Sequence, residues 1–185
     1  MFTVKVEKRI IRHCKTVLET HNFGNRFTAN GTKDQQLTGI IGQSVVMSFF
    51  DLGLMDGLGG CDLGVDLIVN NKTIDVKTMG RTTDVKKSYT NNFIKLQDYF
   101  KTDIYIFCSY HKNKEELTVC GWIDKDTFIT KRRYFPKGTI RTRTNQTTFT
   151  TFTDLFEIDN CHLNTVSNVL DLKKKLNHPL NFNKS

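Results

Sequence analysis

Hydrophobic positions recur along the chain with two different spacings. From residue 4 to residue 20 they lie three or four positions apart, which predicts an amphipathic helix. Residues 65–69 and 73–78 instead read as two β-strands, with polar and apolar side chains on opposite faces. Asn70 and Asn71 lie between these runs. Because asparagine tolerates a positive φ, they predict a two-residue hairpin turn.

A second helix is predicted from residue 34 to Phe50, with Thr32 or Asp34 as its N-cap. Gly39 and Gly42 interrupt it, and each costs a helix about 1 kcal/mol relative to alanine. We therefore expect these glycines to allow close packing against another backbone.

The remaining pattern predicts strands at 103–110, 117–123 and 155–158. It also predicts helices at 124–131, capped by Asp124, and at 164–176, whereas the threonine-rich residues 139–153 follow neither period. Helices before, between and after a mixed sheet indicate an α/β fold. The length of 185 residues fits a single domain, spanning residues 1–185.

The predicted hairpin brings polar residues together on one face. Antiparallel pairing around the Asn-Asn turn puts Asp66 opposite Asp75, with Cβ atoms about 4.5–5.5 Å apart. Lys77 lies two residues beyond Asp75 and shares its face. Two facing carboxylates repel each other unless a positive charge lies between them, and carboxylate oxygens favour Mg²⁺, with Mn²⁺ as a substitute. The hairpin therefore predicts a metal site at Asp66 and Asp75.

Gly64-Val65-Asp66, eight intervening residues and Asp75-Val76-Lys77 resemble the core motif of the PD-(D/E)xK nuclease superfamily. The resemblance covers residues 34–110. It implies a restriction-endonuclease-like mixed central sheet flanked by helices, and a metal-dependent endonuclease that hydrolyses DNA through a metal-activated water. In that family the two acids bind Mg²⁺ and the lysine assists the water, roles that map onto Asp66, Asp75 and Lys77.

Two positions depart from the family pattern. Val65 replaces the proline of the motif name. Many members also carry a glutamate in the preceding helix after Gly-x-x-Gly, whereas this chain has Gln43 there. A glutamine keeps an oxygen ligand but removes a negative charge, so the resemblance makes Gln43 a fourth candidate for the active site.

Positive charge is concentrated in the middle of the chain. The net charge is +8, and residues 72–143 carry all of the excess, with 16 Lys and Arg against 8 Asp and Glu. Clustered positive charge suits a polyanion such as DNA, with RNA not excluded. The candidate contacts are Arg81, Lys86, Lys87, Tyr89, Arg141 and Arg143.

Cysteine spacing and hydropathy indicate the cellular compartment in which we expect the protein. The five cysteines are widely spaced, which predicts reduced thiols. No apolar run approaches the roughly 20 residues that cross a bilayer, and residues 1–9 do not resemble a signal peptide. We therefore expect no membrane contact and a cytoplasmic location, the host cytoplasm if the protein is viral. A homodimer stays open.

Three functions remain open on the sequence alone. The first is the Mg²⁺-dependent DNA endonuclease. The second is a nucleic-acid-binding protein that kept the nuclease fold but has weak or lost cleavage, which Gln43 favours. The third is an interaction or inhibitor protein in which the acidic pair is incidental.

Overall fold

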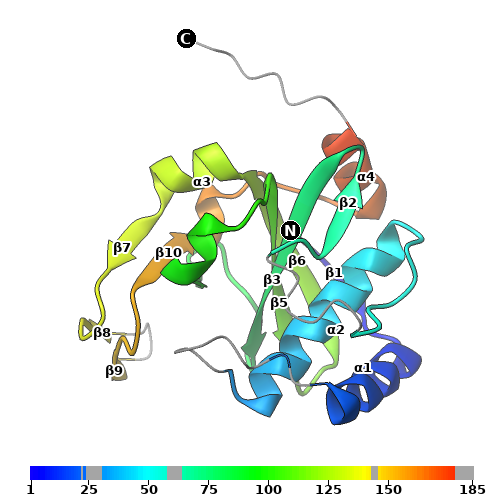
Figure 1. Cartoon of the computed structure of the whole chain (residues 1–185), viewed down its shortest axis with the longest axis horizontal. Helices are drawn as coiled ribbons and strands as arrows, with labels where there is room; N and C mark the ends of the chain where they lie inside the picture. Colours follow the sequence, from blue (N-terminus) through cyan, green and yellow to red (C-terminus); the bar gives the residue numbers. More distant parts are fainter. Residues whose placement is uncertain (22, 24–30, 58–63, 143–145, 178–185) are drawn as a thin grey trace.

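A mixed β-sheet forms the centre of the protein in the computed structural model, which describes residues 1–21, 23, 31–57, 64–142 and 146–177. Its strand order is β1 (Phe2–Lys5), β6 (Glu116–Asp124), β5 (Ile104–His111), β3 (Lys72–Arg81) and β2 (Leu67–Val69). β3 and β5 are parallel, and the other neighbours are antiparallel. The predicted α/β class is confirmed (Figure 1).

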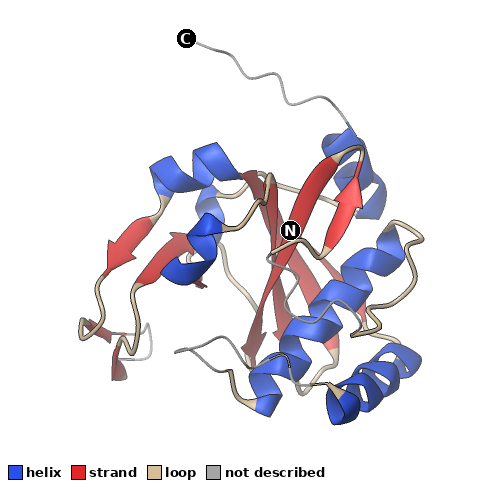
Figure 2. Cartoon of the chain, viewed as in Figure 1, coloured by secondary structure: helices blue, strands red, loops and turns tan. Residues whose placement is uncertain are grey.

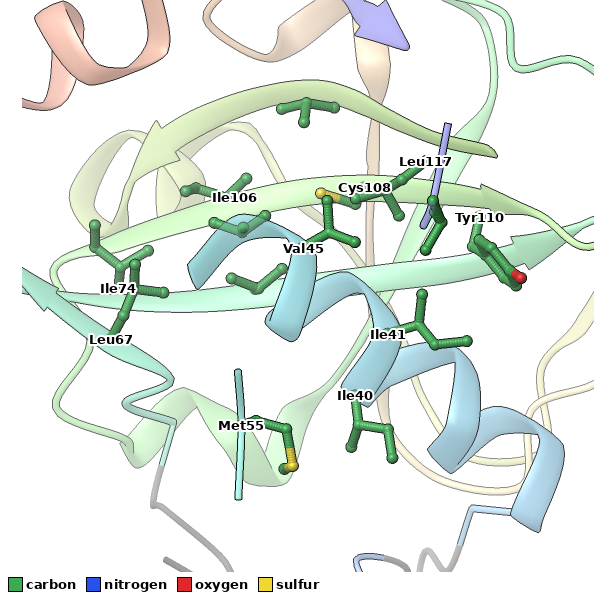
Figure 3. Packing of buried hydrophobic residues seen from close by; sticks show 14 of the residues in the cluster. Ile40, Ile41, Val45, Met55, Leu67, Ile74, Ile106, Cys108, Tyr110 and Leu117 are labelled. Carbon is green, nitrogen blue, oxygen red and sulfur yellow. The ribbon is translucent and has the colours of Figure 1, made fainter. Parts of the chain in front are cut away.

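Helices α1 (Lys8–Thr20) and α2 (Lys33–Phe49) cover one face of this sheet (Figure 2). In Figure 3, Ile41 and Val45 of α2 and Ile74 and Ile106 of the strands all lie in the layer between helix and sheet, with Val45 close to Ile106. All four side chains are at most 4% exposed and belong to the larger of the two hydrophobic clusters. Burial of one apolar side chain of this size stabilises a fold by about 1.5–3 kcal/mol, so this interface holds α2 in place.

The N-terminal helix is shorter than predicted. Residues 2–5 form edge strand β1, in which Phe2 pairs with Val119 of β6, and the helix begins only at Lys8. Phe2, Val4 and Val6 alternate with polar residues, and this short alternation fits a strand. The helical spacing starts at Ile10, so the prediction of a helix from residue 4 was wrong at its first turn.

The second helix begins where the sequence places it. Thr32 accepts a hydrogen bond from the Gln35 backbone N–H, and the Gln35 side chain accepts one from the Thr32 N–H, which forms a capping box. Gly42 lies against β3, because a Cβ there would be only 1.9 Å from Oγ1 of Thr78. Gly39 has open space around it. Gly42 is therefore closely packed, but against a side chain and not against the backbone that was predicted, and the prediction was wrong for Gly39.

Aromatic residues fill the opposite face of the sheet. Phe93, Tyr105, Phe107 and Phe128 are each at most 1% exposed, and Phe93 lies 5.1 Å from Tyr105 between ring centroids. The elements that cover this face are β4 (Thr90–Ile94), α3 (Lys125–Lys131), β10 (Leu155–Asp159) and β7 (Arg133–Phe135). β4, β10 and β7 form a separate antiparallel sheet, shown beside the central one in Figures 1 and 2.

The predicted strands after the hairpin correspond to β5, β6 and β10, and Asp124 caps α3 by accepting a hydrogen bond from the Thr127 N–H. The threonine-rich segment contains a two-stranded ribbon, β8 (Ile140–Thr142) and β9 (Thr148–Thr150). The last helix, α4 (Val169–Asn177), starts later than expected, because Asn164 forms a β-bridge with Trp122. Two short 3₁₀ turns, Lys95–Tyr99 and Asn160–His162, complete the described elements.

Asn70 and Asn71 form the predicted turn, with φ of 49° and 60°. The predicted register is confirmed for β2, since Leu67 pairs with Ile74 and Val69 with Lys72.

Among the described cysteines, Cys14, Cys108 and Cys120 are buried and Cys161 is exposed, all as free thiols. Burial raises the pKa of Cys120 to about 12, so this thiol stays protonated at neutral pH. No helix in the described ranges is both long and apolar enough to span a bilayer.

Candidate functional site

The side chains of strand β3 alternate between the helix-covered face of the sheet and the opposite, aromatic face. Ile74, Val76 and Thr78 face α2, whereas Asp75 and Lys77 point to the side of the aromatic cluster. Asp75 is only 2% exposed, and its Oδ2 lies 2.6 Å from the Lys77 ammonium. The sequence predicts that the two residues share one face, and the structure adds that they form a largely buried ion pair.

Asp66 occupies a different position from the predicted one. Its backbone N–H donates to the Ile74 carbonyl at 2.9 Å, and its Oδ2 accepts the Val76 N–H at 2.6 Å. β2 begins only at Leu67, so the Asp66 carboxylate takes the place that a strand carbonyl would hold. The prediction that Asp66 continues the ladder directly opposite Asp75 was wrong. Asp66 instead contacts β3 through its hydrogen bond with the Val76 N–H, and Asp75 is the β3 residue just before Val76.

Aromatic rings enclose the Asp75–Lys77 pair. The Lys77 ammonium lies 5.4 Å from the centroid of the Phe93 ring. Tyr105 is the β5 neighbour of Asp75, and burial, followed by the negative charge of Asp75, raises the pKa of its phenol well above the usual range. A low-dielectric wall of this kind strengthens the interaction of any charge bound beside Asp75.

The donor set fits a small, hard divalent cation. Asp66 and Asp75 are both carboxylates, the ligand type that Mg²⁺ and Mn²⁺ prefer, and Asp66 binds the backbone N–H of Val76, the residue after Asp75. In this structure Lys77 supplies the positive charge next to Asp75.

Gln43 lies on α2, immediately after the glycine that contacts Thr78, and is half-buried. Within the described residues, β2 pairs with β3 only up to Ile74. Gly42, the residue before Gln43, packs against Thr78, which lies beyond the end of that pairing. Asp75 and Lys77 point away from α2. Gln43 therefore lies on the helix side of the sheet, opposite the face that carries the Asp75–Lys77 pair.

Arg81 is the last residue of β3 and not part of the following loop as the sequence suggested. Its guanidinium lies 4.7 Å from the centroid of the Tyr89 ring and donates from Nη2 to the Thr90 carbonyl at 2.8 Å. Alternation puts Arg81 on the same side of β3 as Asp75 and Lys77. Two of the predicted contacts, Arg81 and Tyr89, are thus brought together near the candidate site.

Lys86 and Lys87 have exposed side chains on the connection between β3 and β4. Their backbone is fixed, because the Lys86 carbonyl accepts from the Asn160 amide at 2.9 Å and the Lys87 carbonyl accepts from the Cys161 N–H at 2.9 Å. The connection therefore presents both ammonium groups to solvent from an anchored backbone.

Arg141 is engaged inside the protein. Its Nη2 lies 2.7 Å from the carboxylate of Glu157, and its guanidinium lies 3.8 Å from the centroid of the Phe135 ring. Glu157 is only 4% exposed, so Arg141 holds the β8–β9 ribbon against β10. A contact with nucleic acid would compete with this ion pair. Arg143, the sixth predicted contact, lies outside the described residues.

One cluster was missed by the sequence analysis. Asp159, Cys161 and His162 have ligand atoms within 4.8 Å of one another. Asp159, however, already accepts two hydrogen bonds from the Arg133 guanidinium and one from Thr90. The only sequence signal for this cluster is the spacing Asp-x-Cys-His. The cluster is a weak candidate metal site, because the Asp159 carboxylate is already hydrogen-bonded to Arg133.

Comparison with known proteins gives no relative. No protein-family model, no curated protein and no solved structure matches the chain.

Proposed function

We propose that the protein is a metal-dependent nuclease with a restriction-endonuclease-like fold, which hydrolyses phosphodiester bonds in DNA. The observation that carries this proposal is the buried ion pair of Asp75 and Lys77 on β3, with the Asp66 carboxylate bound to the intervening Val76 N–H. The order of elements agrees with it: helix α2, hairpin β2–β3, then a parallel β5 beside β3.

Asp66 and Asp75 would hold the cation. A bound Mg²⁺ supplies the charge that lowers the pKa of the attacking water and offsets the charge of the phosphate. The Asp75 carboxylate and the Phe93 ring hold the Lys77 ammonium beside the site. That ammonium is positioned to bind a phosphate oxygen as negative charge accumulates on it.

A second candidate is a nucleic-acid-binding protein with weak or lost cleavage. The observation that favours it is the burial of the acid, since the Asp75 side chain is only 3% exposed and already lies against Lys77. Gln43 adds to this, because it brings no negative charge to a cation.

A cleavage assay separates the candidates. Fluorescent DNA in duplex, single-stranded, flap and four-way-junction form, and the same strand as RNA, is incubated with the protein in Mg²⁺, in Mn²⁺ and in EDTA. We expect cleavage that requires the metal and is lost in Asp75→Asn and Lys77→Met. Asp126→Asn and Lys174→Met are matched controls, because both side chains are exposed on other elements.

Full activity of Asp75→Asn would overturn the site. Binding without cleavage, on every substrate, would favour the second candidate. The interaction protein that the sequence left open predicts neither cleavage nor a salt-sensitive affinity for DNA.

A further inference from the structure

Arg81 is an unusual cation in this protein. Its Nε is buried and has no hydrogen-bond acceptor among the described residues, although Nη2 donates to the Thr90 carbonyl. The guanidinium carbon of Arg81 lies over the Tyr89 ring, 4.7 Å from its centroid. The contacts of Arg81 therefore orient its planar group but leave part of its donor fork unsatisfied.

The charge of Arg81 also lacks a counter-charge among the described residues. Four other arginines of the described chain each meet a carboxylate: Arg9 with Glu7, Arg132 with Asp98, Arg133 with Asp159 and Arg141 with Glu157. No described acid forms an ion pair with Arg81. Asp84, three residues later, is paired with Lys114 at 2.6 Å. Burial lowers the pKa of Arg81, which is the effect of removing a cation from water without a partner.

An external anion would remove this cost, and the guanidinium fork matches a phosphate in particular. Lys77 and Arg81 lie four residues apart on one face of β3, about 13 Å at roughly 3.3 Å per residue. Two cations that far apart bind different phosphates. The exposed Lys86 and Lys87 continue the positive surface beyond Arg81.

We propose that Arg81, whose guanidinium lies over the Tyr89 ring, binds a second backbone phosphate of a polynucleotide, displaced along the strand from the phosphate at Lys77. This inference rests on the proposed function for the position of the first phosphate. It names Arg81 as a substrate-positioning residue whose effect is on binding and not on the chemical step.

The test measures affinity without cleavage. A fluorescein-labelled DNA oligonucleotide, single-stranded or duplex, is titrated with protein in EDTA at several salt concentrations. Arg81→Met should weaken binding about tenfold, the loss of one charge-assisted contact, and reduce the slope of log K against log salt by about one. Arg12→Met is the control, because Arg12 is exposed on α1, which packs on the other side of the sheet.

Two further variants separate the role of charge from that of shape. Arg81→Lys keeps the charge but not the fork, so it should retain the salt slope with lower affinity. Tyr89→Leu removes the ring that orients Arg81 and should likewise lower affinity with an unchanged slope, and it answers the question if Arg81→Met does not fold by circular dichroism. Wild-type affinity in both Arg81→Met and Tyr89→Leu would overturn the proposal.

The outcome is distinguishable from that of the nuclease assay. Weaker binding by Arg81→Met in a protein that never cleaves would support the phosphate site and refute the nuclease. Metal-dependent cleavage with unchanged binding by Arg81→Met would support the nuclease and refute the phosphate site at Arg81.

Discussion

The Lys77 ammonium lies 2.6 Å from Oδ2 of Asp75, two residues earlier on the same strand, with side-chain exposures of 16% and 3%. This pair is more enclosed than two polar residues on an exposed strand. Each partner reduces the cost of burying the other.

Stability should therefore respond unequally to the loss of either partner. Lys77→Met leaves the more buried carboxylate alone and should cost about 2–3 kcal/mol, whereas Asp75→Asn leaves the more exposed ammonium and should cost about 1–2 kcal/mol. Urea unfolding of both variants and of the double variant forms a double-mutant cycle. The double variant should recover part of the loss, and strictly additive costs would show that the pair is not coupled.

Asp75→Ala tests a different expectation. From the sequence alone, this change should abolish cleavage and leave the fold intact, because Asp75 was placed on a polar face. The structure puts Asp75 at 2% exposure, so we now expect Asp75→Ala to lower the urea midpoint as well as the activity. Asp126→Asn, on the exposed first turn of α3, should leave both unchanged.

The two glycines of α2 should respond in opposite directions to alanine. Gly42→Ala places a Cβ 1.9 Å from Oγ1 and 2.8 Å from Cβ of Thr78, so it forces α2 away from β3 and should destabilise by about 1–3 kcal/mol or more. Gly39→Ala meets nothing within 4 Å and should stabilise by about 0.5–1 kcal/mol through helix propensity. Thermal melts of the two variants measure this directly, and equal shifts would contradict the contact at Gly42.

Gln43→Glu tests the resemblance to nucleases at its weakest position. The resemblance assigns position 43 a third acidic ligand for Mg²⁺, so on that assignment the variant should cleave faster or at a lower Mg²⁺ concentration. Affinity for DNA in metal-free buffer should not change. If neither rate nor metal requirement moves, Gln43 serves only to pack α2.

Acid should weaken the contact between β10 and β7. The two hydrogen bonds from Arg133, which have the largest effect, lower the pKa of Asp159 to about 2. The carboxylate is thus stabilised in the folded state, and this contribution is complete above the unfolded pKa near 3.8 and is lost as the pH falls toward about 2.

We expect Asp159→Asn to lower the free energy of unfolding by about 1–2 kcal/mol at pH 7 and by little near pH 2. Urea midpoints of wild type and variant at several pH values check this convergence. A constant difference across the acid range would contradict it.

The sequence by itself determined the elements whose signals are local. The Asn70-Asn71 turn fixes the β2–β3 register through the positive φ of both residues, and Thr32 with Gln35 fixes the start of α2. Alternation along β3 was enough to place Asp75 and Lys77 on one face, because the side-chain period of a strand is two.

Only the tertiary structure decided what surrounds those residues. Tyr105 lies beside Asp75 and Phe93 lies beside Lys77, and these two rings, which are distant in sequence from the pair, are brought there by β5 and β4. Residues 2–5 pair with β6 as an edge strand, whereas the local pattern predicted that the helix would already begin at residue 4. Among the described residues, Arg81 has no acidic partner, whereas Arg141 pairs with Glu157. Charge pairing depends on which segments meet in space, and no local pattern in the chain determines that.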